Sequence, residues 1–316
     1  MIHLSTGPWK AALAGAALGV ACTVLAVAVA RPARAMLARL AHSLRGPVSY
    51  AWVDPDQGAP SGTKYATFFS PTIQRAVSYL IYLPPDYDNA PQQRYPVIYW
   101  LHGRGGTQRE GAYVFVPLLD AAIRSGKAPP VIIVSPNGLG FSRWSDSTAG
   151  DVPVESIFIH DLIPHIDATY RTRAARQDRA IEGFSMGGFG AAHLAFKYPE
   201  IFGAVAMDSA ALFDETNDQQ YQEANSAWYL AVRNAAAIRG RTLVRMTVGQ
   251  EDGLVDLNRK FHLLLEALNI QHELLVFPGV GHNEGRIYSG LGSRVASFYA
   301  SAFGNARQAT YSRPPQ

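Results

Sequence analysis

Short apolar segments alternate with longer amphipathic segments from about residue 62 onwards. The segments predicted as strands are Val77–Leu83, Pro96–Leu101, Val131–Ser135, Arg179–Gly183, Ala204–Asp208, Leu243–Val248 and Glu273–Phe277. The segments predicted as helices are Val114–Ser125, Glu155–Tyr170, Met186–Tyr198, Asn225–Ile238, Val255–Leu268 and Arg286–Phe303. Several strands are apolar throughout instead of alternating, which a parallel sheet covered on both faces requires. The pattern therefore predicts an α/β fold with one doubly wound, mostly parallel sheet and helices on both faces.

The N-terminal segment has a different pattern, because residues 11–30 form an apolar run without a charge. At 1.5 Å per residue this run covers roughly 30 Å of hydrocarbon. Lys10 precedes the run, and two sites with small residues around one larger residue follow it, as in a cleavable signal peptide. Residues 1–35 are thus expected to be a signal peptide or a membrane anchor acting through residues 11–30. The rest of the protein is expected to be secreted or anchored outside the cytoplasm.

The residues after this segment have the composition of a linker. The stretch from Arg45 to Thr63 is rich in Gly, Pro, Asp and Ser, which favours turns over regular elements. We therefore expect a linker at 36–61, a catalytic domain at 62–305 and a C-terminal tail at 306–316.

Composition and charge exclude several classes of protein. The chain has 316 residues, of which 48% are hydrophobic and 17% charged, so it can bury a large core. Its net charge of +3 comes from the N-terminal segment, because residues 1–50 hold five basic residues and no acidic one. The remainder is about neutral and offers no surface for nucleic acid.

The cysteine and histidine content argues against a metal or another cofactor. Cys22 is the only cysteine, which excludes an intramolecular disulfide and any multi-cysteine metal site. His160 and His165 are five residues apart and do not share a helical face, unlike ligands at positions i and i+4. We therefore expect neither a metal nor another cofactor.

The strongest chemical motif is Gly183-Phe184-Ser185-Met186-Gly187, which lies between a predicted strand and a predicted helix. A strand that turns directly into a helix strains the residue at the apex, and glycines on both sides leave space for that turn. Such a turn presents the Ser185 hydroxyl to a substrate as a nucleophile. It also frees the Met186 amide at the helix N-terminus to donate to an oxyanion.

A serine nucleophile needs a base and a carboxylate that orients the base. His282 is the expected base, because it follows the last predicted strand in a loop with three nearby glycines. Asp252, just beyond the strand Leu243–Val248, is the expected acid, and Asp208 is its main competitor. The order Ser, Asp, His along the chain is the one found in hydrolases whose serine lies in a Gly-x-Ser-x-Gly turn between a strand and a helix.

A second oxyanion donor is expected after the strand Pro96–Leu101, where His102-Gly103-Arg104-Gly105-Gly106 forms a glycine-rich turn. The Arg104 amide is the best candidate, with the Gly103 amide as the alternative. His102 is expected to hold this turn by hydrogen bonds. With Trp144, which follows another strand, His102 is also a candidate for binding substrate.

These segments together resemble the esterase D-like putative esterases of the α/β-hydrolase superfamily, a group with feruloyl and acetylxylan esterases, formylglutathione hydrolases and mycolyltransferases. The resemblance covers about residues 62–303. It depends on Tyr82-Leu83-Pro84-Pro85-Asp86-Tyr87, Tyr95-Pro96-Val97, Leu101-His102-Gly103, Asp161-Leu162-Ile163-Pro164-His165-Ile166-Asp167, Tyr170-Arg171-Thr172 and the serine motif. It implies an α/β-hydrolase fold, Ser185, Asp252 and His282 as the triad, and oxyanion amides at Arg104 and Met186. The chain departs from its relatives at Asn283-Glu284-Gly285, where they often carry an aromatic residue or Asp.

The expected activity is hydrolysis of a carboxylic ester through an acyl-enzyme, with a small-molecule or carbohydrate ester of the feruloyl or acetyl type as substrate. One alternative is acyl transfer of the mycolyltransferase type, with a sugar or glycerol hydroxyl as acceptor. A second alternative is a binding protein that keeps the fold without activity.

Overall fold

An eight-stranded sheet forms the centre of the computed structural model, which describes residues 51–55, 58–60, 62–213 and 222–304. The order of the strands is β1-β2-β4-β3-β5-β6-β7-β8. Their bounds are β1 Thr63–Ser70, β2 Arg75–Tyr82, β3 Val97–Leu101, β4 Ile132–Pro136, β5 Arg179–Phe184, β6 Ala204–Asp208, β7 Leu243–Gly249 and β8 His272–Phe277. β1, β2 and β4 pair antiparallel, and all other pairs are parallel. This confirms the predicted mostly parallel sheet.

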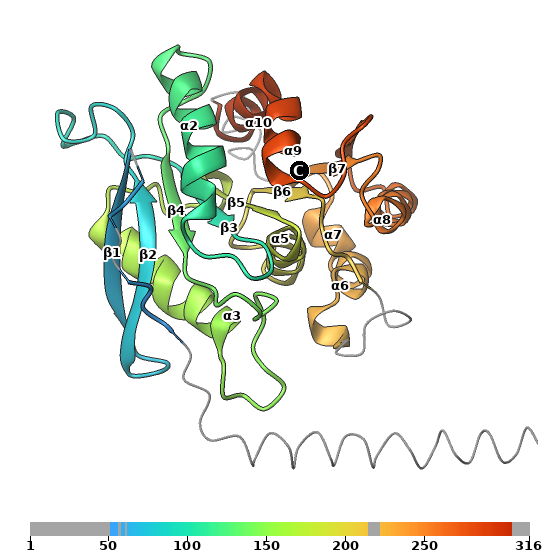
Figure 1. Ribbon diagram of the computed structural model, residues 1–316, viewed down its shortest axis with the longest axis horizontal. Coiled ribbons are helices and arrows are strands. Elements are labelled where there is room, and N and C mark those ends of the chain that lie inside the picture. The colour runs from blue at the N-terminus through green and yellow to red at the C-terminus, as the bar shows by residue number, and fades with distance from the viewer. Residues whose placement is uncertain (1–50, 56–57, 61, 214–221, 305–316) are drawn as a thin grey trace, which may run out of the picture. The chain divides into compact units, whose positions relative to one another are not determined.

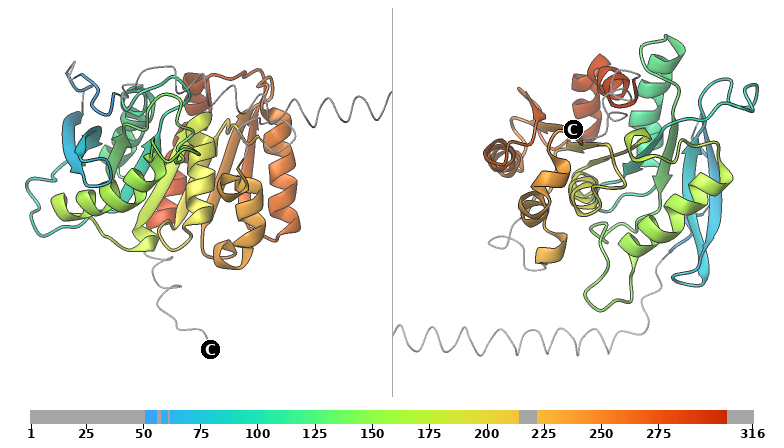
Figure 2. Two further views of the ribbon diagram at one scale, coloured as in Figure 1. Left: turned by 90° about the horizontal axis from the view of Figure 1, so that it is seen from below. Right: turned by 180° about the vertical axis from the view of Figure 1, so that it is seen from behind.

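Helices cover both faces of the sheet (Figures 1 and 2). On one face lie α2 Glu110–Arg124, α9 Glu284–Leu291 and α10 Ser293–Phe303. On the other face lie α3 Val154–Ser156, the π-helix η1 Ile157–Leu162, α4 Ile163–Thr169, α5 Met186–Lys197, α6 Ala227–Arg233, α7 Ala235–Ile238 and α8 Val255–Ala267. Two short 3-10 turns, η2 Arg176–Asp178 and η3 Glu223–Asn225, complete the helical segments of the described residues.

The core follows from the apolar strands that the sequence contains. The central strands β3, β4, β5 and β6 are buried at every position, because helices cover them on both sides. Each of the seven predicted strands is present within two residues of its expected bounds. The predicted helix at 286–303 is divided into α9 and α10 at Gly292, whose φ of 49° interrupts the helical backbone.

The sequence pattern did not predict β1. This strand is at the edge of the sheet, and only Phe68 and Ser70 in it are buried. An edge strand with one neighbour needs few apolar residues, so its pattern is weak. It pairs with all of β2, from Thr63 opposite Tyr82 to Ser70 opposite Arg75.

Residues 51–60, within the predicted linker, contact the domain where the structure describes them. Trp52 is 7% exposed, and its carbonyl oxygen accepts a hydrogen bond from the Ser78 amide. The Arg109 guanidinium donates to the carbonyl oxygens of Pro55 and Gly58. These contacts attach the segment to β2 and to the start of α2.

The other predicted parts of the chain lie outside the described residues. They are the signal peptide or anchor at 1–35, with its apolar run at 11–30, and the tail at 306–316. The division of the chain at residues 35, 61 and 305 stays a prediction. Within the described ranges, no helix has both the length and the apolar character needed to cross a membrane.

Candidate active site

Ser185 lies at the turn between β5 and α5, as the motif predicted. Its φ of 57° and ψ of −113° are a strained backbone conformation for a residue with a side chain. A Cβ at Gly187 would overlap the Leu101 carbonyl oxygen, and a Cβ at Gly183 would overlap the Gly187 carbonyl oxygen. Glycines are therefore required on both sides of Ser185, because the backbones of β3, β5 and the start of α5 approach one another closely.

Backbone hydrogen bonds hold this turn in place. The Ser185 amide donates to the Asp208 carbonyl oxygen at the end of β6, at 2.9 Å. The Ser185 carbonyl oxygen accepts from the Phe189 and Ala211 amides, both at 3.0 Å. The Ser185 hydroxyl is thereby fixed at the carboxyl edge of the sheet.

His282 lies next to Ser185 although 97 residues separate them in the chain. Its Nε2 is 2.9 Å from Ser185 Oγ, and its Nδ1 is 2.8 Å from Asp252 Oδ2. The ring of Phe184 packs against the imidazole, with centroids 4.8 Å apart. The three predicted triad residues therefore form one chain of hydrogen bonds at the carboxyl ends of β5, β7 and β8.

Asp252 is held as a carboxylate beneath the imidazole. It is 2% exposed, and this burial by itself raises the pKa of its carboxyl group. The hydrogen bonds from His282 and from the Leu254 amide, 2.9 Å from Oδ1, favour the charged form and outweigh that effect. The pKa of Asp252 therefore lies below its ordinary value.

Asp208, the competing candidate for the acid, lies in a different environment. Its carboxyl group is buried beside Arg245, with 3.4 Å between Arg245 Nη2 and Asp208 Oδ2. The same Nη2 is 3.0 Å from Glu182 Oε1. His282 bonds to Asp252 instead, so the structure favours Asp252 as the residue that orients the imidazole.

The glycine-rich turn after β3 contacts the serine turn. A Cβ at Gly103 would lie 3.7 Å from Ser185 Cβ, which places Gly103, the residue before Arg104, beside the nucleophile. The Gly105 and Gly106 amides donate within this region, to Gly140 and Gly103. Neither the Arg104 amide nor the Met186 amide donates to a backbone carbonyl in the turns and loops of the described residues, which is consistent with the predicted oxyanion role.

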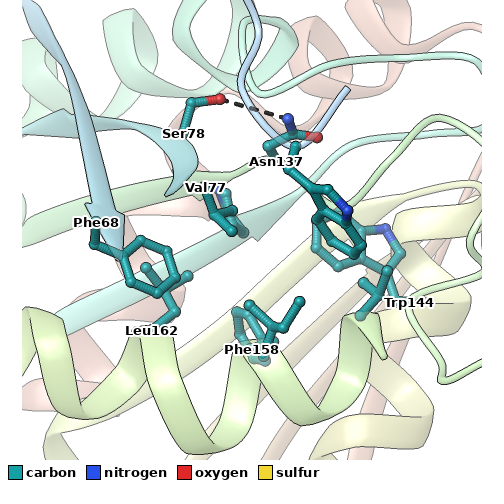
Figure 3. Close-up of a pocket in the computed structure, with 11 residues that line it drawn as sticks. Phe68, Val77, Ser78, Asn137, Trp144, Phe158 and Leu162 are labelled. Atoms are coloured by element: carbon teal, nitrogen blue, oxygen red, sulfur yellow. Dashed lines mark hydrogen bonds between the residues drawn. The ribbon is translucent and has the colours of Figure 1, made fainter. Parts of the chain in front are cut away.

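The structure corrects the two candidates for substrate binding, His102 and Trp144. Their exposed fractions are 0% and 1%, so neither side chain reaches a bound substrate. Trp144 Nε1 donates to the His102 carbonyl oxygen at 3.1 Å, and the indole lines a small apolar pocket with Phe68, Phe158 and other residues between β1–β2 and η1 (Figure 3). His102 Nδ1 is 2.9 Å from the Gly103 carbonyl oxygen, as expected for a residue that holds the turn. Burial lowers the pKa of His102 to about 4, which keeps it neutral.

The sequence did not point to two features beside the turn after β3. Phe141 is 71% exposed, and the Arg104 guanidinium lies over its ring at 5.4 Å from the centroid. A Cβ at Gly105 would be 3.9 Å from this ring. The position of Phe141, a few residues beyond the carboxyl end of β4, was the signal available in the sequence. The second feature is Glu110 at the start of α2, whose carboxylate lies against Gly106 of this turn.

Across the residues that the structure describes, no three His, Cys, Asp or Glu side chains come close enough to hold a metal ion. The donor groups at the site are the serine hydroxyl, the imidazole, the carboxylate and the backbone amides.

Comparison with known proteins identifies the family of this chain. The model of the family described as Putative esterase matches residues 70–294. An esterase of Mycobacterium tuberculosis is 38% identical over 133 residues, which are 41% of this chain and 28% of that protein. The endo-1,4-beta-xylanase/feruloyl esterase of Xylanibacter ruminicola is 33% identical over 148 residues, which are 43% of this chain and 20% of that protein. The matches thus span less than a third of the length of these two relatives.

The similar solved structures cover a larger share of this chain than these two relatives do. A ferulic acid esterase superposes with a TM-score of 0.68 at 27% identity, covering 78% of this chain and all of that one. An S-formylglutathione hydrolase from Agrobacterium tumefaciens superposes with a TM-score of 0.64 at 17% identity, covering 78% and 98%, which shows the shared fold. Because the family model covers well over half of the chain, the protein belongs to the Putative esterase family of the α/β-hydrolase superfamily.

Proposed function

We propose that the protein hydrolyses carboxylic esters through an acyl-enzyme on Ser185. The observation that carries this proposal is the chain of hydrogen bonds from Ser185 Oγ to His282 Nε2 and from His282 Nδ1 to Asp252 Oδ2. In this chain the Asp252 carboxylate accepts a hydrogen bond from Nδ1–H, which leaves Nε2 free to accept the serine proton.

The first half of the reaction forms the acyl-enzyme. Ser185 Oγ attacks the carbonyl carbon of the ester while its proton moves to His282 Nε2. The negative charge that develops on the carbonyl oxygen is stabilised by the amides of Arg104 and Met186. When the carbon–oxygen bond to the alcohol breaks, the imidazolium gives its proton to the leaving alkoxide. The acyl group of the substrate then stays bound to Ser185 as an ester.

The second half repeats these steps with water. His282 takes a proton from a water molecule, whose oxygen attacks the acyl carbon. The same two amides hold the second oxyanion, and the serine leaves with the proton from His282. Asp252 stabilises the imidazolium in both halves without taking up a proton itself.

The proposed substrate is a carbohydrate ester with an aromatic acyl group. Two relatives in the comparison carry feruloyl or ferulic acid esterase in their names. In this chain the exposed ring of Phe141 lies beside the turn that carries the Arg104 amide. An aromatic acyl group bound at Ser185 can stack on that ring.

We also propose that the protein acts outside the cytoplasm, with residues 1–35 as a signal peptide or an anchor. The support for this is the uncharged run at 11–30 and the small residues that follow it. Edman sequencing of the protein purified from its native cells tests cleavage. A start near residue 31 or 36 identifies a signal peptide, whereas an intact N-terminus in the membrane fraction identifies an anchor.

The experiment for the catalytic assignment compares the full-length Ser185→Ala variant with the unmodified full-length protein in the hydrolysis of a nitrophenyl butyrate. We expect turnover to fall by about 10³-fold or more. Ser301→Ala, which removes an exposed hydroxyl on α10, is the matched control and should keep full activity. Labelling by a fluorophosphonate should be lost in the first variant and kept in the second. Equal hydrolysis by the Ser185 variant and the unmodified protein would refute the assignment.

The same assay separates hydrolysis from acyl transfer. Reactions run with and without a sugar or glycerol as acceptor should give free acid in both cases if water is the main acceptor. A new ester of the added alcohol as the main product would make the protein an acyltransferase.

A further inference from the structure

His262 and His272 lie side by side at the amino end of β8, away from the triad. His262 is on α8, and His272 is the first residue of β8, which is an edge strand of the sheet. The distance between His262 Nδ1 and His272 Nε2 is 2.7 Å, and the two ring centroids are 4.9 Å apart. The triad residue His282 follows the opposite end of the same strand. Two imidazoles from different elements therefore turn one nitrogen each to the same point.

The outer nitrogen of each ring has an oxygen acceptor next to it. His272 Nδ1 is 2.7 Å from the Ile270 carbonyl oxygen. Because a carbonyl oxygen can only accept, this contact keeps the His272 proton on Nδ1 and leaves a lone pair on Nε2. His262 Nε2 is 3.5 Å from Glu266 Oε1, one turn further along α8. A carbonyl oxygen or a carboxylate behind the outer nitrogen is the usual arrangement around a histidine that binds a metal ion.

The protons of this pair do not match its contacts when both rings are neutral. The lone pair on His272 Nε2 requires the His262 proton on Nδ1, at the 2.7 Å contact. His262 Nε2 then also has a lone pair, and it lies beside the Glu266 carboxylate, which can only accept. A cation between the two inner nitrogens removes this mismatch, because the His262 proton is then on Nε2 and donates to Glu266. A second proton on His262 would have the same effect, so protons and metal ions compete for the pair.

The charged groups around the two histidines favour a cation between them. The ion-pair contact of His262 is with Glu266, whose negative charge attracts a cation to the pair. Arg294 on α10 is 3.7 Å from Glu273, the residue after His272. Arg259, one turn before His262, is 4.0 Å from Asp256. The other basic residues on or beside α8 and the start of β7 are Arg239, Arg241 and Lys260. Of these, Arg239 donates to the Leu268 carbonyl oxygen, and Lys260 is on another side of α8 because it is two residues from His262.

We propose that His262 and His272 form a binding site for a divalent transition-metal ion such as Zn²⁺, held between His262 Nδ1 and His272 Nε2. Imidazole nitrogen is a preferred ligand of this class of ion, whereas Mg²⁺ and Ca²⁺ prefer oxygen. Bonds from Zn²⁺ to imidazole are about 2.0–2.1 Å long, so the two nitrogens need to separate only to about 3 Å.

The site differs from a buried structural zinc site. Both rings are partly exposed, with 28% of the His262 side chain accessible, so water can complete the coordination of the ion. Two protein ligands instead of four make the binding reversible. The ion would connect α8 to the edge strand β8, and it would stabilise the folded protein because the unfolded chain does not hold the two nitrogens together. This inference goes beyond the proposed function and does not depend on it.

The first test measures Zn²⁺ binding to the full-length protein at pH 7.5 by calorimetry and by the melting temperature. An excess of Zn²⁺ should raise the melting temperature by about 3 °C or more, and Mg²⁺ should not. His262→Asn and His272→Asn should each weaken Zn²⁺ binding about tenfold or more and remove the thermal shift. The controls are His160→Asn, at an exposed position on η1, and His282→Asn in the triad, and both should keep the binding.

The asparagine variants are matched to the metal-free structure. At position 262 the amide can donate to His272 Nε2 as Nδ1 does, and at position 272 it can donate to the Ile270 carbonyl oxygen. We therefore expect the metal-free melting temperatures to stay close to that of the unmodified protein. No response of the unmodified protein to Zn²⁺, an unchanged response in either of these two variants, or its loss in the His282 variant would overturn the proposal.

A second test uses only the unmodified protein, so it does not depend on how the variants fold. Nuclear magnetic resonance of the ¹⁵N-labelled imidazoles shows which nitrogen carries the proton. At pH 7.5 the His262 proton should be on Nδ1 without metal and on Nε2 with Zn²⁺. The affinity for Zn²⁺ should fall about tenfold or more between pH 7.5 and pH 5.5, because protons compete for the inner nitrogens. Unchanged signals of His262 and His272 on addition of Zn²⁺ would contradict the site, whatever the esterase assays show.

Discussion

The carboxylate of Asp252 is buried while the imidazole that it orients is open to substrate. Asp252 Oδ2 is 2.8 Å from His282 Nδ1, and the two side chains are 1% and 40% exposed. A buried acceptor fixes the ring through one strong contact and leaves the opposite nitrogen, Nε2, at Ser185 Oγ. In the proposed mechanism Asp252 therefore determines the tautomer and the orientation of the imidazole, and the exposed edge of His282 exchanges the proton with Ser185.

Replacement of Asp252 by Asn tests this relationship. The amide can donate to Nδ1, which favours the wrong tautomer, so we expect kcat to fall about 10³- to 10⁴-fold with a smaller change in KM. Steady-state hydrolysis of a nitrophenyl ester measures it. The control is Glu251→Gln, an exposed neighbour in the same loop, which should keep its activity. A tenfold loss or less at Asp252 would show that the histidine is oriented by other contacts.

The same carboxylate predicts a change in stability at acidic pH. Because the folded-state pKa of Asp252 is lowered, its contribution to stability is present above the ordinary value of 3.8 and is lost as pH falls through the folded-state pKa. We expect the free energy of unfolding of Asp252→Asn to approach that of the unmodified protein as pH falls from 5 to 3. Urea unfolding at each pH measures it, and a constant difference would contradict the lowered pKa.

The strain at Ser185 predicts that a glycine there stabilises the fold while it removes activity. Ser185→Gly and Ser185→Ala both lose the nucleophile, but only the glycine adopts a φ of 57° without a steric penalty. Relief of the strain exceeds the extra chain entropy of glycine, so we expect Ser185→Gly to be about 1 kcal/mol more stable than Ser185→Ala. Chemical denaturation of the two inactive variants measures the difference. Equal stabilities would mean that the turn stores no strain.

Two glycines with different surroundings test the packing around the serine turn. A methyl group at Gly187 meets the Leu101 and His102 carbonyl oxygens, whereas one at Gly253 meets nothing within 4 Å. We expect Gly187→Ala to lower the free energy of unfolding by about 1–3 kcal/mol and to remove activity, since β3 and α5 must separate. Gly253→Ala should leave stability within about 0.5 kcal/mol of the unmodified protein. Full activity in Gly187→Ala would show that β3 and α5 can move apart without displacing Ser185.

The buried segments were the ones that the sequence predicted most accurately. β6 has the expected bounds, because every residue from Ala204 to Asp208 is buried and apolar or at the strand end. Ser185, Asp252 and His282 lie together because each follows a predicted strand, and the carboxyl ends of parallel strands meet at one edge. Local pattern and global topology agree at these positions.

The features that the sequence did not reveal depend on contacts between distant segments. Trp144 follows a strand like the triad residues do, but it turns inward because its indole bonds to the His102 carbonyl oxygen. β1 was missed because its outer residues are exposed. In each case a tertiary contact decided the outcome over the local pattern.

Arg245 and its two carboxylate partners predict contrasting effects of two substitutions beneath the site. Burial raises the pKa of Asp208 to about 8, the charge of Arg245 acts against this rise, and the charge of Glu182 adds to it. Asp208→Asn should therefore be about as stable as the unmodified protein at pH 6 and more stable at pH 9. Arg245→Met leaves Glu182 buried without its cation and should lower the free energy of unfolding by about 3–5 kcal/mol. A large loss of stability in Asp208→Asn at pH 6 would show that Asp208 is charged there.

The exposed ring of Phe141 predicts selectivity for the acyl group. If an aromatic acyl group stacks on this ring, Phe141→Ala loses about 1 kcal/mol of binding, and kcat/KM for methyl ferulate falls about fivefold. The value for a nitrophenyl acetate should stay within twofold, because an acetyl group does not reach the ring. Phe69→Ala removes a ring of similar exposure, 61%, on the edge strand β1 and should change neither substrate. An equal loss on both esters would show that Phe141 supports the oxyanion turn through its contact with Arg104 instead of selecting the substrate.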